Sequence, residues 1–466
     1  MNAKDLKHKG APGSFRDPSG FVFRKDGIIY RQVNLSYKDN YDFLMSSGLY
    51  RALVDAGLLI SHNEEALAGD GSCADCYKII RPEQVPFISY PYEWSFSQLK
   101  DAALLTLKIQ RIALEFGMSL KDCSAYNVQF RRGRPVFIDT LSFEKSGGDK
   151  PWVAYRQFCQ HFLTPLALMH YKDVRLNQLS RVFIDGIPLD LASSLLPLRS
   201  YLRPSLFFHI HLHSRSQHYF SDKSVRAANR RMSTLSVKGM LDNLESAVRN
   251  MKGRPGKSQW TGYYCDTNYS ADAFEHKKSL VAGYLDKIAP TNVWDLGANV
   301  GTFSRLASKK KIPTISFDSD AAAVEKSYVE CVKNNEEHIL PLVLDLTNPS
   351  PGIGWGNQER ASLSERGPAH TVFALALIHH LVISHNVPLD FIANFLGSIG
   401  AFLVIEFIPK HDSYCRKLLF DREDIFSDYT QENFEHVFKK YFEILDSAQI
   451  KDSERFLYLM KKRTGL

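Results

Sequence analysis

The sequence lacks any long, uninterrupted apolar run. Its longest mostly apolar stretch covers residues 371–383 and is broken by His379 and His380, whereas a membrane-spanning helix needs about 20 apolar residues. The first twenty residues also lack the apolar core of a secretory signal. We therefore expect a protein that neither spans a membrane nor carries a cleaved leader.

Cysteine is scarce, scattered and odd in number. Seven cysteines in 466 residues do not form the even, dense framework of a disulfide-stabilised protein, which favours a reducing, cytoplasmic location. Cys73 and Cys76 form a single C-x-x-C pair, without the second pair that makes a zinc site credible. The sequence therefore predicts no metal site.

What is present is typical of a globular chain of two or three domains: 44% hydrophobic and 23% charged residues. The net charge of +7 is uneven, because residues 201–260 hold eleven Lys and Arg against three Asp and Glu. This stretch could contact nucleic-acid phosphates or an anionic substrate, although a solvated connector is the simpler interpretation. Nothing in the sequence indicates an oligomeric state.

Three regions differ in their pattern of apolar residues. Residues 1–150 mix strand-like and helical pieces (α+β) and end in the loop 146–151, and residues 151–258 are mostly helical and include the basic stretch. Residues 259–466 alternate strands and helices, which predicts an α/β fold with a parallel sheet. The predicted strands are 292–296, 314–318, 339–345, 371–376, 401–408, 441–450 and 455–461, of which the last two form an antiparallel closing hairpin.

The most specific motif is VWDLGANVGTFSRLA, residues 293–307. A strand ends at Asp295, and Gly297 and Gly301 form a turn into a helix, where glycine allows positive φ and a close approach of the backbone to a ligand. Asn299 replaces the middle glycine of a dinucleotide motif and tolerates the left-handed region. A carboxylate at Asp295 would repel a pyrophosphate, but it would attract the methionine ammonium of S-adenosylmethionine.

This pattern resembles motif I of the class I, Rossmann-like methyltransferases, which have a seven-stranded sheet. The resemblance implies that S-adenosylmethionine is the cofactor and that Asp295, Gly297, Asn299 and Gly301 surround it. It also implies that Asp318, at the end of the second strand, accepts the ribose hydroxyls, with Asp320 as a less favoured alternative. Asp345, after the third strand, would meet the adenine amino group.

Candidates for the chemistry follow the fourth and fifth strands. His379 and His380 leave the fourth strand on the substrate side, where a histidine can act as a general base; His380 is favoured, and a structural role is the alternative for both. Glu406 is a charge inside an apolar strand, so it should face the site or be paired. Trp355 is a candidate to stack on adenine. Tyr263, Tyr264 and Tyr269 could line a lid over the cofactor or pack in the core.

Two motifs that the sequence lacks restrict the kind of chemical group that could be methylated. No Asn/Asp-Pro-Pro-Tyr/Phe follows the fourth strand, as in enzymes that methylate exocyclic amines, and there is no Pro-Cys nucleophile for cytosine carbon-5. Hydroxyl, carboxyl or carbon methylation of a small or sugar-like molecule stays open.

Residues 121–144 resemble the catalytic loop of protein-kinase-like phosphotransferases, with Asp122 as base and Asn127 and Asp139 as metal ligands. Lys121 stands where a His-x-Asp motif would begin, and no glycine-rich phosphate loop lies upstream. We therefore predict a degenerate kinase-like scaffold. Separately, His209, His211 and His213 would converge on a metal only if they lay on a strand, and their surroundings are helical.

The combined motifs resemble a family of bacterial two-part methyltransferases that includes host-specific nodulation proteins. The resemblance implies methyl transfer to a small-molecule or saccharide-like acceptor, with the N-terminal regions aiding acceptor recognition. Two alternatives stay open: methylation of RNA or DNA through the basic stretch 201–260, and a non-catalytic, cofactor-binding interaction protein.

Overall fold

The computed structural model describes residues 10–65, 75–147, 150–215, 232–253, 269–420 and 422–463. Internal contacts divide the chain into two compact units. The first comprises Met1–Gly256 and Gly352–Arg360, and the second comprises Lys257–Pro351 and Ala361–Leu466. Residues 352–360 therefore cluster with the first unit, although the sequence places them in the third region. A boundary at residue 150 stays a prediction.

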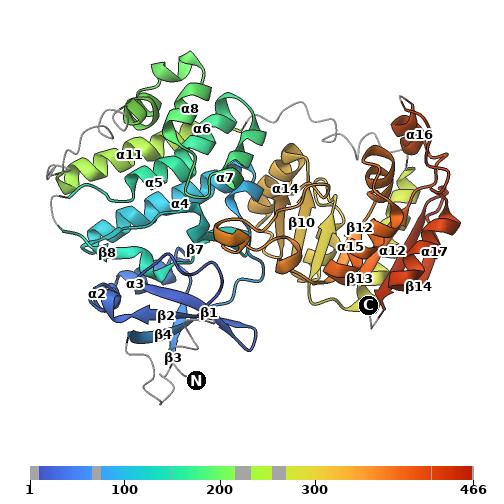
Figure 1. Cartoon of the computed structure of the whole chain (residues 1–466), viewed down its shortest axis with the longest axis horizontal. Helices are drawn as coiled ribbons and strands as arrows, with labels where there is room; N and C mark the ends of the chain where they lie inside the picture. Colours follow the sequence, from blue (N-terminus) through green and yellow to red (C-terminus); the bar gives the residue numbers. More distant parts are fainter. Residues whose placement is uncertain are drawn as a thin grey trace. The chain divides into compact units, whose positions relative to one another are not determined.

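The first unit begins with a four-stranded antiparallel sheet in the order β1-β2-β4-β3 (Figure 1). Its elements are β1 (Gly20–Lys25), β2 (Ile28–Asn34), α2 (Lys38–Ser46), α3 (Leu49–Asp55), β3 (His62–Glu65), β4 (Cys76–Pro82), α4 (Phe96–Glu115), β5 (Met118–Leu120), β6 (Val128–Arg131), β7 (Arg134–Phe137) and β8 (Phe143–Lys145). At the start of helix α4, the Gln98 side chain accepts a hydrogen bond of 2.9 Å from the backbone N–H of Ser95.

The remainder of the first unit is helical in the part that the structure describes. Its elements are α5 (Tyr155–Phe158), η5 (Cys159–Leu163), α6 (Thr164–Tyr171), η6 (Val174–Gln178), α7 (Leu179–Val182), α8 (Leu189–Leu195), η7 (Leu198–Leu202), α9 (Pro204–Leu206), η8 (Phe207–Leu212) and α11 (Thr234–Asn250). His209 and His211 lie in the helical turn η8 and bond neighbouring side chains. Residues 216–231 and 254–260 of the basic stretch, as well as Cys73, Tyr263 and Tyr264, lie outside the described residues.

The second unit contains the predicted seven-stranded sheet, in the order β11-β10-β9-β12-β13-β15-β14. Its strands are β9 (Val293–Leu296), β10 (Thr314–Asp318), β11 (Ile339–Val343), β12 (Ala369–Ala374), β13 (Gly400–Phe407), β14 (Phe442–Gln449) and β15 (Phe456–Lys462). Its helices are α12 (Ala271–Ile288), α13 (Ser304–Lys309), α14 (Ala321–Asn334), η11 (His380–Ser384), α15 (Leu389–Ile399), α16 (Ser413–Leu419) and α17 (Gln431–Tyr441). The first five strands are parallel, and β15 runs antiparallel to both β13 and β14, which confirms the closing hairpin.

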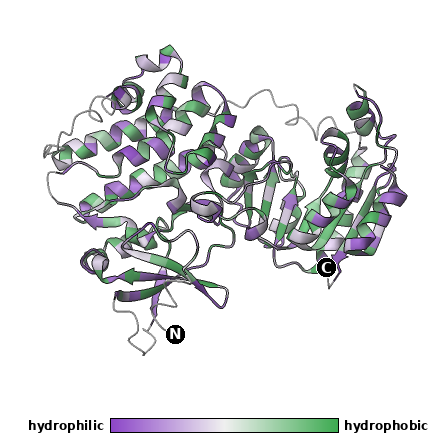
Figure 2. Cartoon of the chain, in the orientation of Figure 1, coloured by the Kyte–Doolittle hydropathy of each residue, from purple (hydrophilic) through white to green (hydrophobic). Residues whose placement is uncertain are grey.

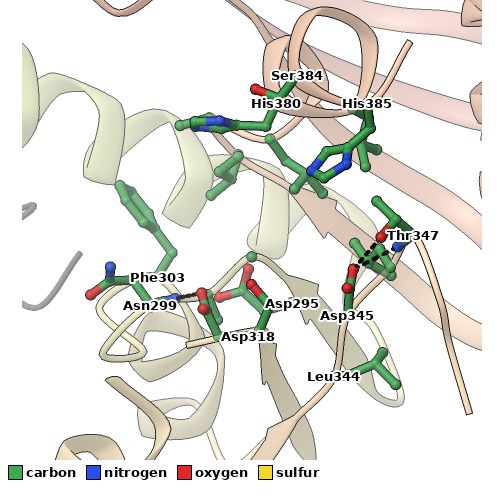
Figure 3. A pocket seen from close by; sticks show the side chains of 18 of the residues that line it. Asp295, Asn299, Phe303, Asp318, Leu344, Asp345, Thr347, His380, Ser384 and His385 are labelled. Atoms are coloured by element: carbon green, nitrogen blue, oxygen red, sulfur yellow. Dashed lines mark hydrogen bonds between the residues drawn. The ribbon is translucent and has the colours of Figure 1, made fainter. Parts of the chain in front are cut away.

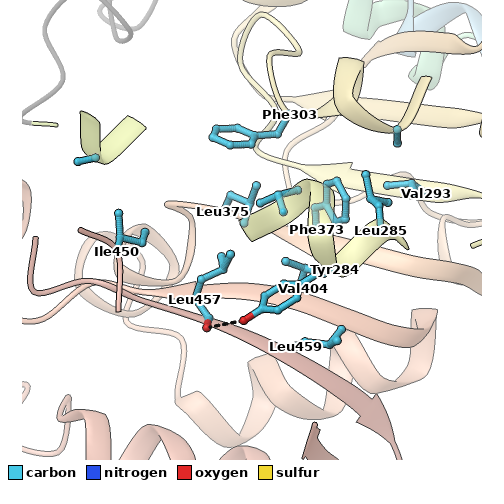
Figure 4. Packing of buried hydrophobic residues seen from close by; sticks show 13 residues of the cluster. Tyr284, Leu285, Val293, Phe303, Phe373, Leu375, Val404, Ile450, Leu457 and Leu459 are labelled. Carbon is cyan, nitrogen blue, oxygen red and sulfur yellow. Dashed lines mark hydrogen bonds between the residues drawn. The ribbon is translucent and has the colours of Figure 1, made fainter. Parts of the chain in front are cut away.

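The central strands carry many hydrophobic residues (Figure 2) and are mostly buried, as expected for parallel strands that are covered on both faces. All four residues of β9 are buried. A cluster of buried side chains joins α12 and α13 to the sheet; it includes Leu285, Val293, Phe303 and Phe373 (Figure 4). This core holds the carboxyl ends of the strands in place beneath the site.

Within the described ranges, no helix is both long and apolar enough to cross a membrane. The same ranges hold no group of three or more His, Cys, Asp or Glu side chains that could bind a metal ion.

Candidate active site

A cavity of about 340 Å³ lies at the carboxyl ends of the parallel strands in the second unit (Figure 3). Residues after four successive strands line it, and this edge is where open α/β sheets bind ligands. The lining includes Tyr269, Asp295, Gly297, Asn299, Asp318, Asp345 and His380 from the sequence prediction, together with Phe274, Lys277, Phe303, Thr347, Ser384, His385 and Leu418.

The turn after β9 has the conformation that its residues predict. Gly297 and Gly301 have φ of +74° and +81°, and Asn299 has φ of +51°, in the region that glycine and asparagine tolerate best. A Cβ atom on Gly297 would lie 3.1 Å from the Leu377 Cδ1 atom. Gly301 shapes the turn but is not among the residues that line the cavity.

Asp295 is buried at the end of β9, and its carboxylate accepts a hydrogen bond of 2.6 Å from the Ser304 hydroxyl. Burial raises the pKa of Asp295 to about 6, and the nearby Asp318 carboxylate adds to the rise. The group is therefore ionised at neutral pH but close to its titration point, and a ligand cation would stabilise its charge.

Asp318, the last residue of β10, holds the glycine turn and faces the cavity. Its two carboxylate oxygens accept hydrogen bonds from the backbone N–H groups of Asn299 (2.7 Å) and Asp320 (2.8 Å). Burial raises its pKa to about 6 as well. Asp320 instead caps α14 through the Ala322 N–H and does not line the cavity, so of these two carboxylates only Asp318 faces the cavity.

Asp345 lies two residues beyond the end of β11, on the wall of the cavity, and is exposed. Its carboxylate accepts hydrogen bonds from the backbone N–H (2.8 Å) and hydroxyl (2.7 Å) of Thr347. These bonds fix the carboxylate, which suits it to accept a hydrogen bond from a ligand amino group.

His380, Ser384 and His385 face the carboxylates of Asp295 and Asp318 from the opposite side of the cavity (Figure 3). Burial lowers the pKa of His380 to about 4, so its ring is neutral at pH 7 and can accept a hydrogen bond. These three polar side chains make this wall suited to a hydroxyl-bearing molecule.

His379 is fully buried and does not line the cavity. Neither of its ring nitrogens has a hydrogen-bond partner among the described residues, and burial lowers its pKa well below the usual value. Of the two predicted histidines, the structure therefore brings only His380 to the cavity.

Glu406 is fully buried in β13 and does not line the cavity either. It is paired, as the sequence allowed: it accepts hydrogen bonds from the Lys277 ammonium (2.7 Å) and the Tyr269 hydroxyl. Burial alone would raise the pKa of Glu406, but Lys277 and Arg455 outweigh burial and lower it. Lys277 and Tyr269 are the members of this network that reach the cavity.

Sequence reasoning missed Lys277, Ser384 and His385. A signal for Lys277 existed, because it lies on the apolar face of α12 at helical spacing with Ala273 and Val281, both buried. Trp355 does not line the cavity; it belongs to the segment 352–360 that clusters with the first unit, and it is 78% exposed, so its stacking on adenine stays a prediction.

In the first unit, the residues that resemble a kinase loop are engaged with one another and with an arginine. The Arg31 guanidinium forms ion pairs with Asp139 (2.8 Å) and Asp17 (2.9 Å). Asn127 donates to the Ser142 hydroxyl (3.3 Å). Asp139, the predicted metal ligand, therefore has its charge balanced by Arg31.

No protein-family model matches the chain. It is 36% identical to the nodulation protein NoeA of Rhizobium meliloti (strain 1021) over 460 residues, which cover 97% of this chain and 95% of NoeA. Among solved structures, it is similar to magnesium protoporphyrin IX methyltransferase (ChlM) from Synechocystis PCC 6803 with bound SAH (16% identity, TM-score 0.31, covering 44% of this chain and 93% of that one). It is also similar to the N-methyltransferase NodS from Bradyrhizobium japonicum WM9 (12% identity, TM-score 0.30, covering 41% and 98%).

Proposed function

We propose that this chain, which belongs to the family of the nodulation protein NoeA, transfers a methyl group from S-adenosylmethionine to a small-molecule or saccharide-like acceptor. The observation that carries the proposal is the set of three carboxylates, Asp295, Asp318 and Asp345, which follow three neighbouring parallel strands and line one cavity beside the glycine turn. Such a site offers acceptors to an ammonium, to ribose hydroxyls and to an adenine amino group. The same carboxylates would repel a pyrophosphate.

The residues present fit the cofactor. Asp295 would bind the ammonium and Asp318 the ribose hydroxyls, while the turn at Gly297 would let the backbone approach the ligand closely. When bound, S-adenosylmethionine supplies an electrophilic methyl group. Asp345, fixed by Thr347, would accept from the adenine amino group.

The acceptor would lie against the wall formed by His380, Ser384 and His385. The neutral His380 ring would accept a hydrogen bond from an acceptor hydroxyl and hold its oxygen toward the methyl group. This wall offers hydrogen-bonding groups rather than a phosphate-binding array of arginines, which supports a saccharide-like molecule over nucleic acid.

The test uses S-adenosylmethionine labelled in its methyl group, with a bacterial extract separated into saccharide, RNA and protein fractions. We expect the wild-type chain to label the saccharide fraction and Asp318→Asn to reduce the labelling strongly at the same cofactor concentration. Label confined to RNA would replace the proposed acceptor by nucleic acid. No label in any fraction, from a protein that binds the cofactor, would favour the non-catalytic alternative.

A further inference from the structure

Lys277, on α12, is a lysine buried at the wall of the cavity. Only 2% of the residue is exposed, and it is among the residues that line the cavity. Burying an ammonium is costly unless it is paired and hydrogen-bonded. The groups that surround the Lys277 ammonium therefore indicate its role.

The Lys277 ammonium has three N–H donors, and its hydrogen bond within the described residues goes to Glu406, at 2.7 Å. Its remaining contacts are with aromatic faces: the ammonium lies 4.6 Å from the ring centre of Phe303 and 5.2 Å from that of Tyr269. These cation–π contacts stabilise the charge but accept no conventional hydrogen bond. N–H donors of Lys277 are thus left for a ligand in the cavity.

The charges behind Lys277 are balanced and held in place. The Arg455 guanidinium bonds Asp412 through two nitrogens, at 2.8 and 3.0 Å, and lies 3.8 Å from Glu406. Glu406 also accepts from the Tyr269 hydroxyl. Two cations therefore face two carboxylates, and this network fixes the position of the ammonium from the side away from the cavity.

Lys277 and Asp295 line the same cavity, are both buried and carry opposite charges, but they do not form an ion pair with each other. Each is instead anchored separately, Lys277 by Glu406 and Asp295 by Ser304. Two fixed, opposite charges across one cavity complement a zwitterion. An α-amino-acid group, with an ammonium and a carboxylate on one carbon, has this arrangement of charge.

We propose that Lys277 binds the methionine carboxylate of S-adenosylmethionine while Asp295 binds the ammonium of the same group, and that Glu406 is a positioning residue for Lys277. This inference rests on the proposed cofactor. It assigns Glu406 to the site only through Lys277, in agreement with the absence of Glu406 from the cavity wall.

The test compares two ligands by calorimetry: S-adenosylhomocysteine, which has the amino-acid group, and 5′-methylthioadenosine, which lacks it. Lys277→Gln keeps a hydrogen-bond donor for Glu406 but loses the charge. We expect this variant to bind S-adenosylhomocysteine about 10- to 100-fold more weakly, the scale of a charged hydrogen bond, and methylthioadenosine as the wild type does. Lys278→Met, the neighbouring residue on α12 that does not line the cavity, is the matched control and should leave both affinities unchanged.

If Lys277→Gln fails to fold, the double variant Lys277→Leu with Glu406→Leu removes the whole ion pair, an exchange that buried sites often tolerate. The same loss, confined to S-adenosylhomocysteine, is expected. An equal loss for both ligands, or none for either, would overturn the role of Lys277. A folded wild type that binds neither ligand would instead refute the cofactor site on which the inference rests.

Discussion

The three carboxylates that line the cavity, those of Asp295, Asp318 and Asp345, differ in their exposure to solvent. The first two carboxylates have pKa values raised to about 6 because they are removed from water, whereas Asp345 is exposed. A buried carboxylate with a raised pKa is stabilised most by a ligand that supplies the missing positive charge or hydrogen bonds. The two groups that are costliest to ionise are therefore the two assigned to the cofactor's ammonium and ribose.

This gives a pH dependence for cofactor binding. Asp295 and Asp318 are mostly ionised at pH 7 and become protonated as the pH falls through about 6, while the ligand's ammonium stays charged. Affinity for S-adenosylhomocysteine should therefore fall by about tenfold for each carboxylate between pH 7 and pH 5. Calorimetry across this range measures it, and an affinity that is unchanged or rises at pH 5 would contradict the assignment.

His379 and His380 are adjacent in sequence but should respond differently to substitution. His379 buries two ring nitrogens without partners among the described residues, so His379→Leu removes unsatisfied polar atoms and should leave the thermal midpoint unchanged or raise it. His380→Leu should keep cofactor binding but lose methyl transfer. Differential scanning calorimetry and the labelling assay measure the two effects; equal loss of transfer in both variants would mean that His379 also acts on the acceptor.

The sequence indicated the carboxylates of the site because each lies at or just after the carboxyl end of a recognisable strand. The helical spacing in α12 placed Lys277 among buried residues, but the sequence did not show that this helix face, or the segment at His385, meets the cavity. For Glu406 the sequence left two outcomes, facing the site or being paired. The structure shows that Glu406 is paired, because Lys277 and Arg455 from other parts of the chain lie beside its carboxylate.

At the scale of elements, the Glu406 carboxylate in β13 forms ion pairs with Lys277 on α12 and with Arg455, the residue before β15. Glu406→Gln would leave Lys277 and Arg455 without their shared carboxylate. We expect it to lower the free energy of unfolding by about 3 kcal/mol or more, the cost of breaking a buried ion pair. Urea unfolding measures this. The exposed Glu443→Gln on β14 is the control, with an expected change within about 0.5 kcal/mol. If both variants were equally stable, the network would not hold the sheet together.

Strand positions followed from apolar runs, and the strand 314–318 was predicted to the residue. The sequence could not give the place of β15 between β13 and β14, because a hairpin alone leaves open which of its strands joins the sheet. The alternating burial along β14 and the buried run in β15 are consistent with edge and interior positions.

At the scale of the molecule, residues 121–144 of the first unit resemble a kinase loop, but an arginine pairs with the aspartate in the position of a metal ligand. Because Arg31 pairs with Asp139, we expect calorimetry to show no magnesium-dependent binding of ATP at millimolar concentration. Asp139→Asn should leave this result unchanged. Magnesium-dependent ATP binding that disappears in Asp139→Asn would contradict this and make the unit a nucleotide site.

The division of the chain was predictable only in part. The alternating pattern after residue 259 indicated a separate α/β unit, and contacts place the change of unit at residues 256–257. The return of residues 352–360 to the first unit could not be predicted, because it depends on contacts distant in sequence. Ile353, for example, packs against the Tyr90, Tyr92 and Tyr126 cluster, and the Arg360 guanidinium lies 4.3 Å from the Tyr126 ring centre.

The most direct test of the account is calorimetric titration of S-adenosylhomocysteine into the wild type, Asp318→Asn and the control Asp286→Asn, an exposed position in the same unit that does not line the cavity. The account predicts micromolar binding to the wild type and the control, and binding weaker by about 1–3 kcal/mol in Asp318→Asn. No binding to folded wild-type protein, or equal binding by all three, would contradict the cofactor site.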